Sequence, residues 1–358
     1  MNPYEYGNKT AYGIESDALR YTWAGYFLTV IASSLIGDTA ILIASIRYDT
    51  FKLHEVMTVI IQHIAVCDLM VTVMDVCPRF VSVTAGEWTF GTYWCYLLPY
   101  AAYYLNPVSI LLICAMTTFK LLLMKYPDKF EGTTIKQAHR ICWACWLAGL
   151  TFPVSFYHQG WDDIQFSYRI YHCNFVYSKD IWRSWLKPLL GFVFLFIPTC
   201  LVVVNTIYML MIAKSSADQR DRGSLNWQGI MATVLTATFY CISVLPTFVY
   251  AAVEGFVHVH DKSKSFFHVQ FYRVIHSFIF LNTMSNFFIY CLTVLSFRDF
   301  VKAKLARSYQ FFTRAENVDR KTSTSVVVTL IASMATAAVT SHGRRISESD
   351  SELDTSYD

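Results

Sequence analysis

Residues 92–127 read TYWCYLLPYAAYYLNPVSILLICAMTTFKLLLMKYP, and this stretch decides how the rest of the chain is interpreted. Its middle, residues 101–118, carries no charged side chain. About 20 helical residues cross the hydrocarbon core of a bilayer, so the stretch is long enough to span a membrane at a tilt. Cys95 lies beyond one end of the uncharged part, and Lys120 and Lys125 lie beyond the other. The stretch therefore predicts a transmembrane helix with a thiol at one end and cations at the other.

The composition of the whole chain is that of a membrane protein. Hydrophobic residues make up 54% of the 358 and charged residues only 15%, whereas soluble chains average about 25% charged residues. The net charge of +3 is too small to indicate a nucleic-acid partner. Apolar runs recur along the sequence at residues 21–46, 56–80, 92–124, 141–157, 186–213, 230–252 and 271–295. These runs predict an all-α membrane protein, a bundle of seven transmembrane helices.

The distribution of charge predicts how the bundle is inserted in the membrane. Residues 120–140 carry five basic side chains against two acidic ones, and residues 298–314 carry five against one, whereas the first 20 residues have a net charge of −1. Cytoplasmic loops are enriched in Lys and Arg. We therefore expect a multi-pass protein of the plasma membrane whose N-terminal tail, residues 1–20, is extracellular. Asn8 begins an Asn-Lys-Thr triplet and is then an expected glycosylation site. Cys95 and Cys173 would share the oxidising face, which permits a disulfide between them.

The C-terminal part of the chain is expected to contain a helix followed by a tail. One helical face gathers the apolar side chains of Phe297, Phe300, Val301 and Leu305. A short amphipathic eighth helix should therefore lie in the membrane interface and complete one helical unit at residues 21–310. Residues 311–358 are rich in Ser, Thr, Asp and Glu and should form a mostly disordered cytoplasmic regulatory tail. A merely solvated tail is the alternative to phosphorylation at the candidate sites, which are Ser347, Ser349 and Ser351.

Two ionisable residues stand out inside the apolar runs. Asp38 lies in the first run and Asp68 in the second. Ionisable groups at membrane depth are costly and usually functional, so the pair favours an ion or proton site. Two structural carboxylates that bond to neighbouring helices are the alternative.

An ordered set of motifs resembles the rhodopsin-family (class A) G-protein-coupled receptors over residues 21–310. Gly37-Asp38 is similar to a Gly-Asn pair in the family's first helix, and residues 64–68, IAVCD, are similar to Leu-Ala-x-x-Asp in the second. The sequence EWTFG at residues 87–91 resembles the family's first outer loop. Residues 282–290, NTMSNFFIY, followed by Phe297-Arg298, resemble its seventh helix. The fourth, fifth and sixth helices are matched by Trp143, Pro153, Pro198 and Pro246.

The resemblance implies roles for particular residues. Cys95 and Cys173 stand where the family has its disulfide. Lys120 and Tyr290 stand where the family couples to a heterotrimeric G protein, and arrestin and membrane lipids are the other implied partners. A mid-membrane cluster that binds sodium in the family would be formed by Asp38, Asp68, Ser109, Asn282 and Asn286. Because the family has one carboxylate there and this chain has two, we expect the cluster to hold a cation or one shared proton.

The chain also departs from the family pattern. Phe119-Lys120-Leu121 replaces Asp-Arg-Tyr, so the acid that restrains the family's arginine is absent, and a lysine lacks the planar fork of arginine. Residues 243–246, SVLP, replace Cys-Trp-x-Pro, and Phe287 replaces a proline in the seventh helix. These departures bear on G-protein coupling rather than on the architecture.

The absence of particular charged residues excludes two classes of ligand. No lysine occurs between Lys264 and Lys302 to form a retinal Schiff base, and the outer third of the third helix offers no acid for an amine. Aromatic and neutral polar side chains favour a peptide, most simply a neuropeptide, although interfacial anchoring of aromatic residues is the alternative. The expected ligand pocket consists of Tyr103, Tyr104, Asn106, Tyr250, Tyr272 and His276.

Two other classes of protein remain open. One is a seven-span scavenger that binds a ligand without G-protein output, which the altered Phe119-Lys120-Leu121 makes credible. The other is a seven-span zinc hydrolase, for which His63, His276, Asp68 and Asp75 show no metal-ligand spacing. The His-Val-His triplet at residues 258–260 is interpreted as a solvated loop rather than a metal site. We therefore expect a receptor, not an enzyme, with no cofactor other than a sodium ion.

Overall fold

The structure is a computed structural model that describes residues 5–6, 17–47, 55–157, 164–168, 170–175, 189, 191–218, 227–257, 266–307 and 310. It divides into two units, Met1–Phe300 and Val301–Asp358, and each is described by itself. In the second unit, residues 301–307 are helical.

The first unit is a helical bundle, as the apolar runs predict. The first run forms α1 (Asp17–Arg47), and the third forms α4 (Gly91–Lys125). The second is a continuous helical segment made of α2 (Glu55–Val71), a π-helical turn η2 (Thr72–Val76) and α3 (Cys77–Ala85). The remaining runs form α6 (Ile135–Tyr157), a π-helical turn η4 (Phe192–Phe196) with α8 (Ile197–Asp218), α9 (Trp227–Val257), and α10 (Phe266–Ser277) with α11 (Ile279–Thr293). A short helix, α5 (Pro127–Phe130), connects α4 and α6.

Seven helical segments therefore correspond to the seven expected crossings within the described residues, and the fold class is confirmed. Six of them are long and apolar enough to cross a membrane by length and composition. The exception is α6, which begins at Ile135 rather than at residue 141 and so includes Lys136 and Arg140. These charged residues lower the hydropathy of its first turns but leave it helical over 23 residues.

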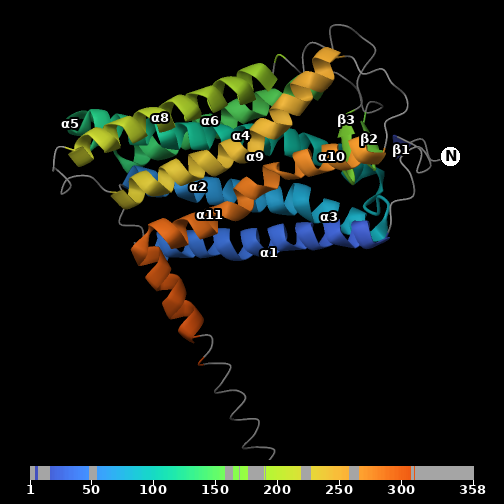
Figure 1. The fold of residues 1–358 in the computed structure, drawn as a ribbon, viewed down its shortest axis with the longest axis horizontal. Helices are drawn as coiled ribbons and strands as arrows, with labels where there is room; N and C mark the ends of the chain where they lie inside the picture. Colours follow the sequence, from blue (N-terminus) through green and yellow to red (C-terminus); the bar gives the residue numbers. More distant parts are fainter. Residues whose placement is uncertain are drawn as a thin grey trace, which may run out of the picture. The chain divides into compact units, whose positions relative to one another are not determined.

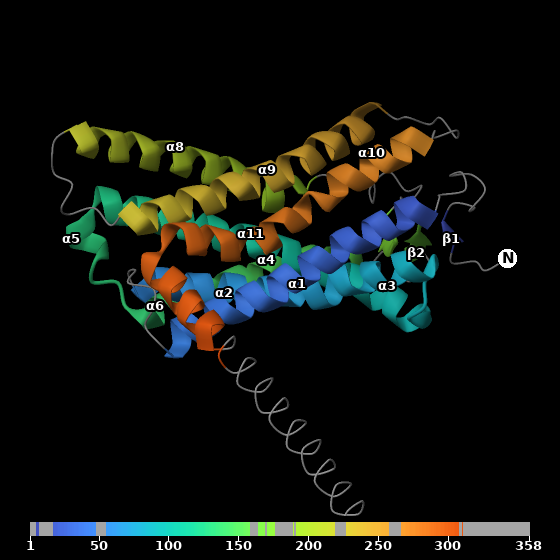
Figure 2. The same ribbon diagram turned by 60° about the horizontal axis from the view of Figure 1, so that its bottom comes forward.

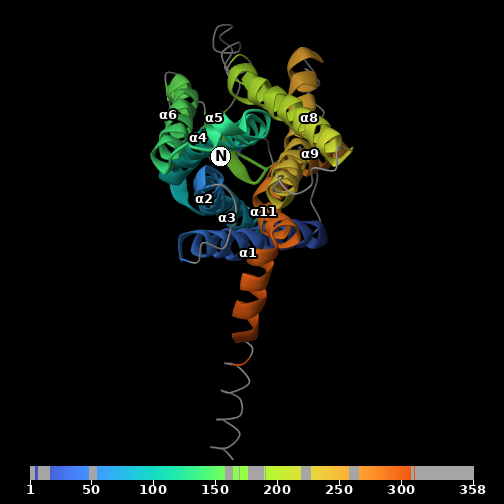
Figure 3. The same ribbon diagram turned by 90° about the vertical axis from the view of Figure 1, so that its left-hand side faces the viewer.

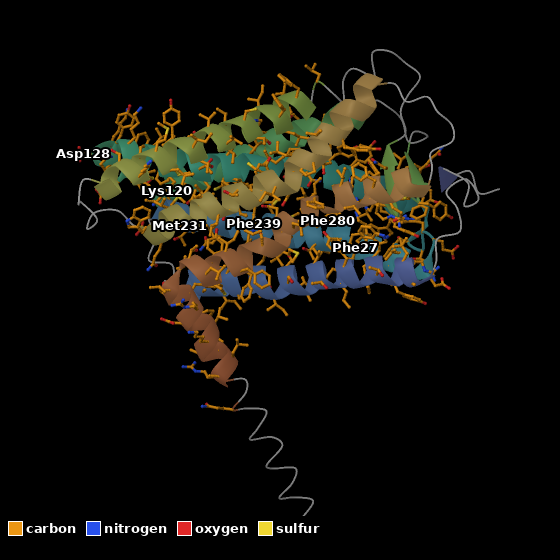
Figure 4. The ribbon with its side chains drawn as sticks, viewed as in Figure 1. Phe27, Lys120, Asp128, Met231, Phe239 and Phe280 are labelled. Carbon is orange, nitrogen blue, oxygen red and sulfur yellow. A yellow bond between two sulfur atoms is a disulfide. The ribbon has the colours of Figure 1, made fainter. Side chains whose placement is uncertain are left out.

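The helix α4 is the centre of this arrangement, because it contacts α2, α6, α8 and α9 (Figure 3). Its packing against α6 requires a glycine: a Cβ at Gly149 would collide with the side chain of Val108. On the other side, α1 packs along α2, α3 and α11 (Figure 2). Phe27 and Phe280 join α1 to α11, with their ring centroids 6.1 Å apart (Figure 4).

Three short strands lie at one end of the bundle (Figure 1). β2 (Ile164–Ser167) and β3 (His172–Phe175) form an antiparallel hairpin, and β1 (Glu5–Tyr6) pairs with β2 in parallel. A disulfide between Cys95 and Cys173, with Cα atoms 5.3 Å apart, joins the hairpin to the start of α4. Lys120 lies toward the opposite end (Figure 4). We call these the strand end and the Lys120 end.

Residues 295–300 continue the first unit beyond α11 and are helical. Phe297 is fully buried, because its ring contacts those of Phe287, Tyr290 and Phe300. The apolar face expected for the eighth helix is thus formed in part by Phe297 and Phe300.

Candidate functional site

A cavity of about 190 Å³ lies between the helices beneath the hairpin. Its lining comes from the second helical segment, α4, β3, α9, α10 and α11. Tyr103, Asn106 and His276 of the expected ligand pocket line this cavity. The residues that line it are therefore drawn from most of the bundle, as expected for a ligand site among helices.

Three tyrosines of the expected pocket lie elsewhere. Tyr104 contacts the ring of Trp146, 5.9 Å away on α6, because one residue along a helix turns the side chain by about 100° from Tyr103. The rings of Tyr250 and Tyr272 contact each other at 5.0 Å and do not line the cavity. These three residues are therefore not part of this cavity, since a side chain's face and its packing partner decide what it lines.

The outer wall of the cavity contains a buried ion pair. Arg79 donates from Nε to Oδ1 of Asp75 at 2.7 Å and from Nη1 to the carbonyl oxygen of Ile170 at 2.9 Å. Only 2% of Asp75 and 4% of Arg79 is exposed. Asp75 belongs to the π-helical turn η2, and Arg79 follows four residues later on α3. The two buried charges therefore neutralise each other, and the bond from Arg79 to Ile170 attaches the hairpin to α3.

His172 of β3 approaches the same pair from the hairpin. Its Nδ1 donates to the carbonyl oxygen of Cys173 at 2.6 Å, which leaves Nε2 facing Oδ1 of Asp75 at 3.5 Å. Burial, together with the positive charge of Arg79, lowers the pKa of His172 to about 4. The ring is therefore neutral at pH 7, and His172 adds no charge to the wall.

A second arginine fixes the other side of the hairpin turn. Arg273 of α10 is 3% exposed and donates from Nη2 to the carbonyl oxygen of Tyr168 at 2.9 Å. Its guanidinium lies over the rings of Tyr171 and Trp23, at 4.7 and 5.7 Å from their centroids. Tyr168, Ile170 and Tyr171 are all buried, so the turn is packed into the strand end of the bundle.

The sequence pattern does not predict Arg79, His172 and Arg273 as site residues. A signal did exist for the ion pair, because an acid and an arginine four residues apart inside an apolar run indicate a buried pair on one helical face. His172 and Arg273 acquire their roles only from the position of the hairpin, which the sequence pattern does not give.

The inner end of the cavity leads to the two membrane-depth carboxylates. Asp68, Ser109 and Asn282 line the cavity, and Asn286 donates from Nδ2 to Oδ2 of Asp68 at 2.6 Å. Asp38 accepts a hydrogen bond from Ser34 at 2.7 Å and interacts electrostatically with Asp68. The five residues expected to form an ion or proton site therefore lie around Asp68, either along the same cavity or in direct interaction with its carboxylate.

Several oxygen atoms in this cluster are acceptors without donors. Among the described residues, Oδ1 of Asp38, Oδ1 of Asn282 and Oδ1 of Asn286 are buried and have no hydrogen-bond partner. Buried polar atoms are normally paired, and carboxylate and amide oxygens are the ligands that hard cations prefer. The residues present therefore fit a small cation such as sodium.

At the Lys120 end, Phe119 and Lys120 are both 6% exposed on α4. The salt bridges between described residues do not include Lys120. Two residues before Lys120, Thr118 accepts a hydrogen bond at Oγ1 from Nδ2 of Asn205 at 2.8 Å, which ties α8 to α4. Tyr290 of α11 is buried, and its ring contacts Phe297.

Other expected sites lie outside the described residues. These are the glycosylation site Asn8, the His-Val-His triplet at 258–260, and the phosphorylation sites Ser347, Ser349 and Ser351. Within the described part of the chain, no three His, Cys, Asp or Glu side chains gather as a metal-binding group.

Comparison with known protein families identifies the chain. The model of the family described as 7 transmembrane receptor (rhodopsin family) matches residues 38–290, which is more than half of the sequence. The chain belongs to this family. The receptor is thus a multi-pass membrane protein of a family whose members bind ligands and signal through G proteins rather than catalyse reactions. The match begins at Asp38 and ends at Tyr290, so it includes the cavity, both carboxylates and the Lys120 end.

Proposed function

We propose that this receptor binds an extracellular peptide at its strand end and activates a heterotrimeric G protein at its Lys120 end. The observation that carries the proposal is the cavity beneath the hairpin, which is lined by the Asp75–Arg79 ion pair and otherwise mostly by apolar side chains. The basic residues at 120–140 support a cytoplasmic Lys120 end by the positive-inside rule. The disulfide between Cys95 and Cys173 supports an extracellular strand end, since disulfides persist in oxidising compartments.

The size and chemistry of the cavity suit one part of a peptide better than a whole drug-sized molecule. Its volume of about 190 Å³ is below the roughly 300 to 1,000 Å³ of a drug-sized site. It therefore accommodates one part of a peptide rather than the whole ligand. Neutral donors and acceptors on Tyr103, Asn106 and Asn174 suit the amide groups of a peptide main chain.

A screen of a neuropeptide library on cells that express the full chain tests this function. We expect at least one peptide to produce a calcium, cyclic AMP or arrestin response that is absent from untransfected cells. The active peptide should then stimulate nucleotide exchange on purified G protein. Arrestin recruitment through Ser347, Ser349 and Ser351 belongs to the same proposal.

A second candidate function is a seven-span scavenger without G-protein output. It is favoured by Lys120, which is buried beside Phe119 where the family has an arginine beside an acid. A peptide that binds with high affinity and is internalised, yet leaves nucleotide exchange at the unliganded rate, would assign the scavenger function instead.

Restoring the family pattern at the Lys120 end should change basal signalling. Lys120 has Phe119 beside it and therefore no adjacent carboxylate to restrain it. The ligand-independent signalling of this receptor should consequently be higher than that of a receptor with the family's Asp-Arg pair. The double variant Phe119→Asp and Lys120→Arg should lower basal nucleotide exchange several-fold and enlarge the agonist response, since coupling free energies of this kind are about 1 to 3 kcal/mol. The measurement is nucleotide exchange at matched surface expression.

The two single variants serve as controls for this prediction. Lys120→Arg alone lacks the restraining acid, and Phe119→Asp alone lacks the arginine fork, so neither should reproduce the double variant. If the double variant leaves basal and stimulated exchange unchanged, the family's restraint does not operate in this receptor.

A further inference from the structure

The hydrogen bonds of the Asp75–Arg79 pair leave one acceptor atom and one donor atom of the pair unused. The pair uses Oδ1 of Asp75 and Nε of Arg79 for their mutual bond, and Nη1 of Arg79 for Ile170. The hydrogen bonds that the pair makes with described residues involve neither Oδ2 of Asp75 nor Nη2 of Arg79. Both side chains line the cavity. A bound group therefore meets a carboxylate acceptor next to a guanidinium donor.

We propose that this pair binds a primary carboxamide, namely the amidated C-terminus of the peptide ligand. The amide oxygen accepts from Nη2 of Arg79, and the amide nitrogen donates to Oδ2 of Asp75. This inference rests on the proposed function, because it takes the ligand to be a peptide. It goes further by naming the end of the peptide that enters the cavity and the chemistry of that end.

The charge of the wall selects a neutral group. Arg79 is already neutralised by Asp75, and His172 is uncharged at pH 7, so the outer wall has no excess positive charge for a carboxylate. A free C-terminus would bring its negative charge against Asp75 and leave the carboxylate without a donor. An ammonium group would compete with Arg79 for Asp75 and leave Nη2 facing a cation. Only a group with both an acceptor and a donor satisfies both atoms.

The rest of the lining indicates the residue that precedes the amide. Apolar side chains line much of the cavity besides the ion pair, and they include Val71, Ile110, Leu195, Val244 and Ile279. Asp68 lies at the inner end, where Asn286 bonds it. The cavity volume of about 190 Å³ fits a single residue. The C-terminal residue of the ligand should therefore be apolar or aromatic.

Small probes test the amide preference without knowledge of the natural peptide. Purified full-length receptor in lipid nanodiscs is titrated with N-acetylphenylalanine amide, its dimethylamide, its free acid and phenethylamine, and binding is followed by ligand-observed NMR. We expect the primary amide to bind about tenfold more tightly than the other three, with affinities in the millimolar range. The dimethylamide isolates the bond to Asp75, because it keeps the carbonyl but has no N–H.

Variants assign the preference to the ion pair. Arg79→Lys keeps the charge but loses the fork, so the amide should bind about tenfold more weakly. Asp75→Asn should remove the discrimination against the free acid. The control is Asp17→Asn, which breaks the exposed Asp17–Arg20 pair, 3.1 Å long, and should leave all four affinities unchanged.

Each other outcome overturns the inference. Tighter binding of the free acid would assign Arg79 as a carboxylate site, and tighter binding of phenethylamine would assign Asp75 or Asp68 as a cation site. Equal affinities, or no binding of any probe up to about 20 mM, would leave the ion pair a purely structural link to the hairpin. The wild-type comparison decides the matter even if a variant fails to fold. An amide preference without agonist-driven nucleotide exchange would keep this inference and overturn the proposed signalling function.

Discussion

Cys173→Ser is expected to lower the free energy of unfolding of the receptor by about 2 to 4 kcal/mol. The Cys95–Cys173 disulfide joins residues 78 positions apart, and closing a loop of this size removes much conformational freedom from the unfolded chain. The bond also attaches β3 to α4, so its loss should loosen the hairpin over the cavity. Thermal unfolding of purified receptor and the fraction of protein at the cell surface are the measurements.

Two comparisons make the disulfide prediction specific. Cys95→Ser and the double variant should match Cys173→Ser, because either single change removes the same bond. Cys200→Ser is the control, since Cys200 is an exposed free thiol and its loss should leave the melting temperature unchanged. Mass mapping that finds both Cys95 and Cys173 reduced in surface receptor would contradict the prediction.

Asp68→Asn is expected to abolish a stabilisation of the receptor by sodium. A ligand that binds only the folded state stabilises it by RT ln(1 + [L]/Kd), which is about 2.7 kcal/mol when the ligand is at 100 times its Kd. We expect sodium chloride, compared with choline chloride at equal ionic strength, to raise the melting temperature of the wild type at pH 7.5. Asp68 lines the cavity together with Asn282 and accepts a hydrogen bond from Asn286, so its neutralisation should remove this difference.

The second carboxylate should make this sodium effect depend on pH. Two buried carboxylates in one cluster bind either a cation or a shared proton, so protons and sodium compete and the sodium effect should weaken as pH falls from 7.5 to 5.5. Asp38→Asn leaves one carboxylate and should remove most of this pH dependence while retaining a sodium effect. A sodium response identical in wild type and Asp38→Asn at every pH would exclude the coupled pair.

The sequence predicted the bundle well because hydropathy and helix length are local properties. Uncharged runs near 20 residues can satisfy their main-chain hydrogen bonds in a membrane only as helices, so their number and order follow directly. The position of Cys173 beside Cys95 came from the family resemblance. Hydropathy gives the run at 141–157 its place in the order but not the start of its helix, because α6 begins at Ile135 and its first turns include charged residues that lie outside the apolar run.

The candidate site was harder to predict because a pocket is a property of facing side chains. Tyr103 and Tyr104 are adjacent in sequence and therefore point to different neighbours, one to the cavity and one to Trp146. Arg79 lines the cavity after a π-helical turn, which no residue pattern predicts and which alters the phase of the helix that follows it. Arg273 is buried only because the hairpin turn covers it.

The attachment of the hairpin turn has a consequence for how the receptor can diversify. Arg79 and Arg273 hold the turn through the carbonyl oxygens of Ile170 and Tyr168. Every amino acid has this oxygen, so substitution of either side chain keeps the bonds that position the turn. Tyr171 is the restricted position, because its φ of 49° favours glycine or asparagine. Replacing the side chains of Tyr168 and Ile170 should therefore change which ligands are accepted, while the two arginines keep the hairpin in place.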